Sequence, residues 1–414
     1  MLSPMRVADF LVETLAYFAK EIDGPPPGVP LHIDARFETE LVAISQYQRL
    51  GTLVSESFDR LALPPTVSRI TIARINQQAE ELESQRRERL RTLRKVLAAF
   101  NQAGVRVAVL GDAWTAAGTG DVARLRPVER IDLMIDERDW MKAVQQLRGL
   151  GFTRSRIQPR LAETGPSGPN PRAVAAALRY HHYFAPLVMH DAQGDTVALR
   201  FRVIDFGHPG RANPAWERVC NGEVGGESAR FLSREDQLLH ALVTCASEGF
   251  ADLLPVLDAG LVVARYRDVL DWRYVTDRAR KLGLYPACYF TVEHVCDLLG
   301  IGLGASRLAA PPRWRRRLFH AWWRPLEADF SGATEPSGGR FGFYLIECRG
   351  LVAKLLWLTR SMFPPAEWVR SVYGRPANPW LRLKFLFDVR SGWRRKGPPA
   401  PESGHDATHL TRSR

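Results

Sequence analysis

The spacing of apolar residues between positions 66 and 104 is the feature that most constrains the fold of this chain. Most of these spacings are three, four or multiples of them, which is the period of one face of an α-helix. The apolar residues concerned are Val67, Ile70, Ile75, Leu82, Leu90, Leu93, Leu97 and Phe100. We therefore predict one long helix, which Gly104 ends. Together with the helical pattern that precedes it, this helix assigns residues 1–103 to an N-terminal helical region.

After Gly104 the pattern changes to the alternation that is typical of strands. The stretches "VRVAVLG" and "RIDLMI" each alternate, and "DAWTAAGTG" between them has the composition of a short helix. Two more strands are predicted in "LRYHHYFAPLVMH" and "DTVALRFRVIDFG", after a helix in "DERDWMKAVQQLRGLGF". We expect residues 105–110, 130–135 and 198–205 to be strands of one sheet. Residues 104–210 are therefore predicted to form a small α/β core.

The rest of the chain is again helical in pattern. Residues 228–310 and 311–390 are predicted to form two helical regions, and residues 391–414 form a tail poor in large apolar side chains. The tail is therefore predicted to be disordered. The fold class that follows is α+β, with a small mixed-sheet core between N-terminal and C-terminal helical segments.

Charge and cysteine content indicate which partners and which cellular compartment to expect. The formal net charge is +12, from 57 Lys and Arg against 45 Asp and Glu, which favours anionic partners. No apolar run approaches the roughly 18 residues of a membrane span. The five cysteines form no C-x-x-C pair, so neither a zinc knuckle nor a redox motif is indicated. We predict a cytoplasmic protein with reduced thiols.

Three segments occur in an order that resembles a known family. They are "GVRVAVLGDAW", "RPVERIDLMID" with "LRGLGF" after it, and "VIDFGH". Together they resemble the uncharacterised bacterial nucleotidyltransferase family of the polymerase-β-like superfamily. The later "SREDQLLHALVTC" and "LDAGLVV" look like the domain that follows in that family, which carries a His and then an Asp, here His240 and Asp258. "SMFPPAEWVRSVYG" is similar to its closing signature, and the resemblance covers roughly residues 40–385.

The resemblance implies an enzyme that moves a nucleotide from a nucleoside triphosphate to a small-molecule or peptide acceptor. In such a reaction two Mg²⁺ ions neutralise the charge that develops on the phosphate, and these ions need oxygen ligands. Carried over to this sequence, the metal-binding catalytic carboxylates are Asp132 and Asp205. The nucleotide-binding residues are Gly111, Asp112, Arg126 and Arg130.

The departures from the family pattern matter for the chemistry. The family's Lys before the glycine is Leu110, and the first of its paired metal-binding aspartates is Arg130. A guanidinium at that place disfavours a two-metal site and can instead contact a phosphate directly. Without the family resemblance, the residues alone predict an ion pair of Arg130 and Asp132 on one strand face, and a helix cap at Asp112.

Three hypotheses for the function therefore stay open at the level of the sequence. The first is a nucleotidyltransferase with an unknown acceptor. The second is a catalytically degenerate member that binds nucleotide or a partner protein. The third is a basic nucleic-acid-binding module, for which "RWRRRLFHAWWRPL" has a suitable composition, although its aromatic residues are expected to pack into the core.

Overall fold

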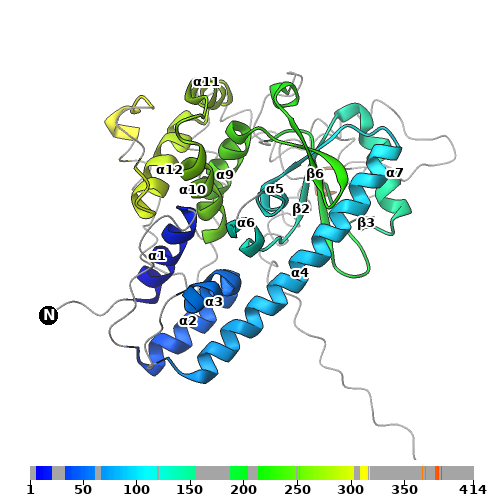
Figure 1. Ribbon diagram of the computed structural model, residues 1–414. Helices are drawn as coiled ribbons and strands as arrows, with labels where there is room; N and C mark the ends of the chain where they lie inside the picture. The colour runs from blue at the N-terminus through cyan, green and yellow to red at the C-terminus, as the bar shows by residue number, and fades with distance from the viewer. Residues whose placement is uncertain are drawn as a thin grey trace, which may run out of the picture.

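A single long helix joins a helical bundle to a mixed sheet in the computed structural model of the protein (Figure 1). The structure describes residues 6–20, 33–60, 67–118, 121–154, 187–203, 213–248, 250, 252–302, 308–315 and 317, together with 366, 369, 378–381 and 384. Most of the predicted region 311–390 and all of the tail 391–414 lie outside these residues. The predicted domain limits themselves stay predictions.

Four helices form the N-terminal part of the molecule. They are α1 (Val7–Ala19), α2 (Ala35–Tyr47), α3 (Gly51–Arg60) and α4 (Arg69–Gln102). The 34 residues of α4 confirm the predicted long helix. Its first turn is capped by Ser68, whose hydroxyl accepts a hydrogen bond of 3.2 Å from the Thr71 amide. At its other end Gly104 has a φ of +65°, a conformation that favours glycine and turns the chain out of the helix.

The described residues form one seven-stranded sheet in the order β3-β4-β5-β2-β1-β7-β6. The strands are β1 (Val107–Leu110), β2 (Ile131–Ile135), β3 (Thr153–Arg154), β4 (Leu187–His190), β5 (Thr196–Arg200), β6 (Cys220–Val224) and β7 (Glu227–Phe231). Strand β2 is antiparallel to β1 and parallel to β5, and β1 is parallel to β7. The sheet is therefore mixed, and the α+β fold class predicted from the sequence is confirmed.

The three strands predicted for the core lie side by side in this sheet as β1, β2 and β5, but the third departs from the predicted 198–205, because β5 ends at Arg200 and residues 201–203 form bends. The sequence prediction did not include the hairpin of β6 and β7, which adds two strands beyond the predicted core. Its turn is formed by Gly225 and Gly226, with φ values of +56° and +85°. The sheet thus extends to residue 231.

Side chains on the two faces of the central strands enter two different hydrophobic cores. On one face, Val109 and Leu133 pack with Leu97 and Phe100 of α4 and with α7 (Trp140–Gly149). On the other face, Leu110 and Met134 belong to the core that the remaining helices share. Asp132 lies between Ile131 and Leu133 and, by the alternation of a strand, faces the second core.

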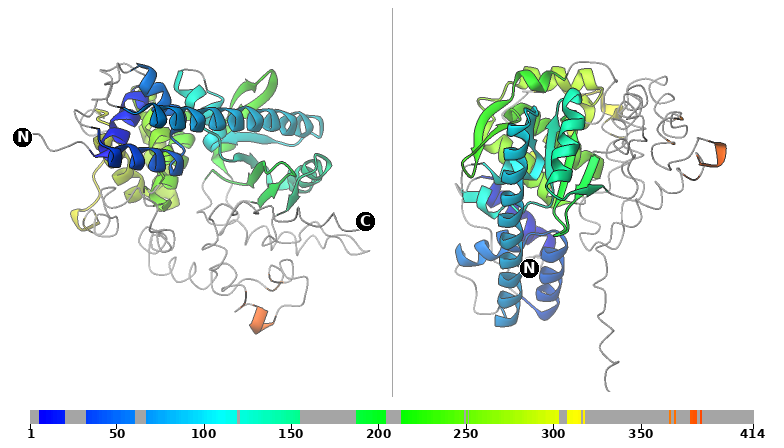
Figure 2. Two further views of the ribbon diagram at one scale, coloured as in Figure 1. Left: turned by 90° about the horizontal axis from the view of Figure 1, so that it is seen from below. Right: turned by 90° about the vertical axis from the view of Figure 1, so that its right-hand side faces the viewer.

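The C-terminal helices cover that second face and pack on the N-terminal bundle. They are α9 (Arg234–Glu248), α10 (Leu253–Tyr266), α11 (Trp272–Leu282) and α12 (Tyr285–Leu298). Helix α1 lies against α10, and their buried residues form one continuous core (Figures 1 and 2). Two short helices, α5 (Gly111–Ala116) and α6 (Asp121–Leu125), connect β1 to β2, and two 3₁₀ turns lie at Glu137–Asp139 and Pro214–Glu217. Within the described residues, no helix has the length and apolar character required to cross a membrane.

Candidate functional site

Asp132 lies at the centre of the sheet, opposite Leu110 of β1 and Ala198 of β5. Its carboxylate is almost fully buried and accepts hydrogen bonds from two arginines. The Arg130 Nε donates to Oδ2 at 3.0 Å, and the Arg200 Nε donates to Oδ1 at 2.8 Å. The ion pair between Arg130 and Asp132 that the strand pattern allows is therefore present. Arg200 was not predicted, and it makes the pair a three-residue cluster.

The charges in this cluster fix the ionisation of Asp132. Burial alone would raise the pKa of its carboxyl group, but Arg130 and Arg200 more than offset this effect and lower the pKa to about 2. In return, the Asp132 carboxylate raises the pKa of the Arg130 guanidinium. All three side chains are ionised at neutral pH, so the cluster carries one net positive charge.

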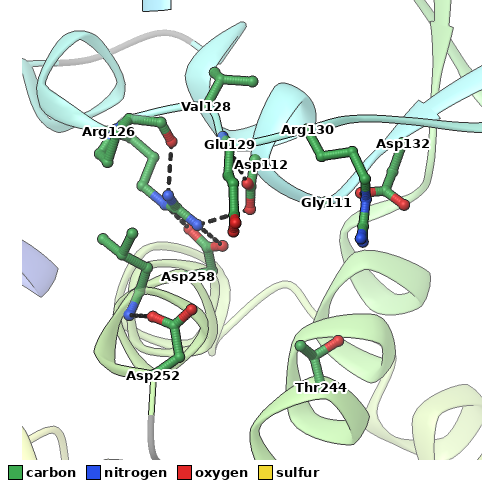
Figure 3. Close-up of polar contacts among 12 residues, drawn as sticks. Gly111, Asp112, Arg126, Val128, Glu129, Arg130, Asp132, Thr244, Asp252 and Asp258 are labelled. Carbon is green, nitrogen blue, oxygen red and sulfur yellow. Dashed lines mark hydrogen bonds and ion pairs between the residues drawn. The ribbon is translucent and has the colours of Figure 1, made fainter. Parts of the chain in front are cut away.

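Gly111, predicted to bind phosphate, lies directly beside this cluster (Figure 3). Its φ of +63° is in the left-handed region, and a Cβ there would lie 3.6 Å from the Asp132 Oδ2 and 3.5 Å from the His240 Nε2. The Gly111 amide donates to the Gln237 Oε1 at 3.2 Å, so this amide is already paired within the protein. His240 donates from Nδ1 to the Val203 carbonyl at 3.0 Å, which leaves Nε2 as the ring nitrogen on the side of Gly111.

Arg126 and Asp112, also predicted to bind nucleotide, belong to a second and buried cluster (Figure 3). The Arg126 side chain is 1% exposed and makes two hydrogen bonds of 2.9 Å to Asp258 of α10. A third, also 2.9 Å long, reaches the Asp112 Oδ1. Burial lowers the pKa of Arg126, but Asp258 and Asp112 more than compensate and raise it. Asp112 accepts from Arg126 and from the Glu129 amide, so it does not act as the helix cap that the residues alone predicted.

Arg49, which the sequence analysis did not select, extends the second cluster to the N-terminal helices. It lies between α2 and α3 and pairs with Glu129 and with Asp252, which caps α10 through the Leu254 amide. Its φ of +58° is uncommon for a residue with a side chain and marks a constrained position. A pocket of about 300 Å³ opens beside it, between α4 and residues 127–129.

Comparison with known proteins identifies the family. A family described as "uncharacterised nucleotidyltransferase" matches residues 35–300, which is more than half of the chain. The chain belongs to this family. No curated protein and no solved structure matches it.

The resemblance found in the sequence implies a pair of Mg²⁺ ions, but the residues around Asp132 do not fit such ions. Both of its oxygens already accept from guanidinium groups. Near a protein surface, a guanidinium 4 Å away repels a cation by about 4 kcal/mol per unit of charge. Among the residues that the structure describes, no three His, Cys, Asp or Glu side chains gather as a metal site. Asp205, the other predicted ligand, lies outside those residues, so its approach to Asp132 stays a prediction.

Proposed function

We propose that this nucleotidyltransferase-family protein binds the phosphates of a nucleoside triphosphate through Arg130, without a divalent metal ion and without two-metal catalysis. The proposal rests on one observation: the Asp132 carboxylate, which would have to be a metal ligand, is bonded to both Arg130 and Arg200.

The geometry of Arg130 supports a phosphate contact. Its guanidinium uses Nε for Asp132, and within the described part of the chain no further partner is found for its two Nη groups. The side chain as a whole is 33% exposed. A planar guanidinium edge with two parallel N–H donors is well suited to bidentate phosphate binding. The net positive charge of the cluster favours the same ligand.

The other functional hypotheses stay predictions. Transfer of the nucleotide to a small-molecule or peptide acceptor follows from the family resemblance, and so does the use of Mg²⁺. A partner protein as the ligand follows from the degenerate metal-binding motif, and a nucleic acid follows from the basic charge of the chain and the composition of "RWRRRLFHAWWRPL". None of these hypotheses explains why a buried carboxylate at the centre of the site is held by two arginines.

Calorimetric titration with ATP tests the proposal directly. We expect wild-type protein to bind ATP with the same affinity, within about threefold, in Mg²⁺ and in chelator. Arg130→Ala should weaken binding by about tenfold or more, because a hydrogen bond to a charged group contributes about 1.5–3 kcal/mol. Arg130→Asp should make the remaining binding dependent on Mg²⁺, since it restores a pair of carboxylates on the strand.

Arg138→Ala is the matched control. Arg138 pairs with Asp136 beyond the other end of the same strand, and its side chain is 84% exposed. Its loss should leave ATP binding unchanged. Wild-type protein that bound ATP only with Mg²⁺ and turned it over would contradict the proposal. If neither wild type nor variants bound ATP, the core would be a scaffold, and partner binding would become the leading hypothesis.

A further inference from the structure

Residues 126–130, the segment that carries Arg130, run between α6 and β2 without belonging to either. This segment is nevertheless tied to several different elements. Arg126 bonds to Asp258 of α10, the Val128 carbonyl accepts from Arg89 of α4, and Glu129 pairs with Arg49. A segment outside regular secondary structure is held in place by such side-chain contacts, because it has no ladder of backbone bonds to do so.

One carboxylate joins both ends of this segment. The Asp112 Oδ1 accepts from the Arg126 Nη2 at 2.9 Å, and its Oδ2 accepts from the Glu129 amide at 3.1 Å. Asp112 also follows Gly111 in α5. Asp112 therefore connects Gly111, its neighbour in the sequence, with Glu129, the residue immediately before Arg130.

Arg126 holds this carboxylate in place through Asp258. Its guanidinium bonds to Asp258 through Nε and Nη2, and Nη2 also reaches Asp112, while Nη1 bonds to the Pro127 carbonyl at 2.7 Å. Four of its five N–H donors are engaged in this way and the side chain is 1% exposed, so Arg126 is not open to a ligand from solvent in this arrangement. Its contacts are all made within the protein, as expected for a group that orients others.

We propose that Arg126 and its partner Asp258 are positioning residues for Arg130. By fixing the segment 126–130 against α5 and α10, they hold the Arg130 guanidinium where it meets Asp132 and a phosphate. This inference rests on the proposed function for its ligand, but the placement of the segment can be measured without one. It assigns to the helical region, through Asp258, a direct part in the binding site of the core.

The test uses the full-length Asp258→Asn variant and two measurements. We expect amide hydrogen exchange in peptides that cover residues 126–130 to become faster by about tenfold or more, because Arg126, which holds the Asp112 acceptor of the Glu129 amide, loses its charged partner. We expect ATP affinity in chelator to fall by about tenfold. Asp258→Glu keeps the charge, so it should restore part of the slow exchange in residues 126–130 and part of the ATP affinity.

Glu235→Gln is the matched control for a purely structural effect. Glu235 is a buried carboxylate of α9 that bonds to Arg218 at 3.0 Å, away from the segment. Its substitution should lower thermal stability without changing exchange in residues 126–130 or ATP affinity. Equal effects of Glu235→Gln and Asp258→Asn, or no effect of Asp258→Asn on the segment, would overturn the inference.

The inference stays testable if Asp258→Asn does not fold or if wild-type protein does not bind ATP. If Asp258→Asn does not fold, Arg126→Lys takes its place, because lysine keeps the charge but cannot bridge two carboxylates with a planar fork. The same changes in exchange and affinity are expected, and their absence overturns the inference. Wild-type protein that fails to bind ATP contradicts the proposed function, whereas the exchange measurement still decides whether Asp258 holds the segment.

Discussion

Replacing Asp132 by asparagine removes the central charge of the site while keeping nearly the same shape. In the wild-type protein this carboxylate neutralises one of two adjacent guanidiniums. The neutral amide of the variant would leave Arg130 and Arg200 close together with no counter-charge between them. We therefore expect the variant to be less stable than wild type at neutral pH.

The size of the effect follows from the pKa of Asp132. The two arginines outweigh burial and hold this pKa at about 2, against an ordinary value of 3.8. A shift of this size favours the folded state by about 2 kcal/mol at neutral pH. Because the folded-state pKa is depressed, this stability is present above about pH 4 and is lost as the pH falls towards about 2. The difference in the free energy of unfolding between wild type and Asp132→Asn should therefore shrink by about 1 kcal/mol between pH 7 and pH 3.

Urea unfolding of both proteins at pH 7, 5, 4 and 3, followed by tryptophan fluorescence, measures this difference. Asp136→Asn is the matched control, because Asp136 ends the same strand region but pairs with an arginine that is 84% exposed. Its effect should be smaller at every pH, since an exposed pair is screened by solvent. A stability difference for Asp132→Asn that stayed constant from pH 7 to pH 3 would refute the electrostatic reasoning.

Two further substitutions test the backbone and the core around the site. Gly111→Ala should destabilise the protein by about 1–2 kcal/mol because its φ of +63° is unfavourable for any residue with a Cβ, although the nearest atom would be 3.5 Å away. Thermal unfolding measures this loss of stability. The control is Gly149→Ala, where the added Cβ would lie in open space at the end of α7, and it should leave stability unchanged. Equal losses of stability in the two variants would refute the argument. Leu97→Ala should cost about 2–5 kcal/mol in urea unfolding, because Leu97 is fully buried between α4 and the sheet, and a loss below about 1 kcal/mol would contradict that packing.

Local patterns predicted much of the fold. The long helix and the strands β1 and β2 are encoded in the spacing of neighbouring apolar residues, so the sequence alone could identify them. The same holds for the ion pair of Arg130 and Asp132, because side chains two apart on a strand share a face. In each case the partners are close in the chain, and their geometry follows from the secondary structure.

What the sequence could not provide was contact between distant segments. Arg200 reaches Asp132 only because β5 pairs with β2 in one register, which the pattern of either strand leaves open. The contact of Arg126 with Asp258 likewise needs the position of α10 on the core. The hairpin of β6 and β7 was missed because Val224 is the single buried residue of β6, although Gly225 and Gly226 were an available turn signal.

Helix α4 has a mechanical consequence for the whole molecule. Its 34 residues span about 50 Å, with Ile75 in the core of the helical bundle and Leu97 in the core beneath the sheet. A continuous rod embedded at both ends does not act as a hinge. The bundle and the sheet must therefore turn as one body, and a fragment that starts after α4 would expose the apolar side chains that the helix covers. Cutting the chain at the apparent boundary near residue 103 would divide a core rather than separate two units.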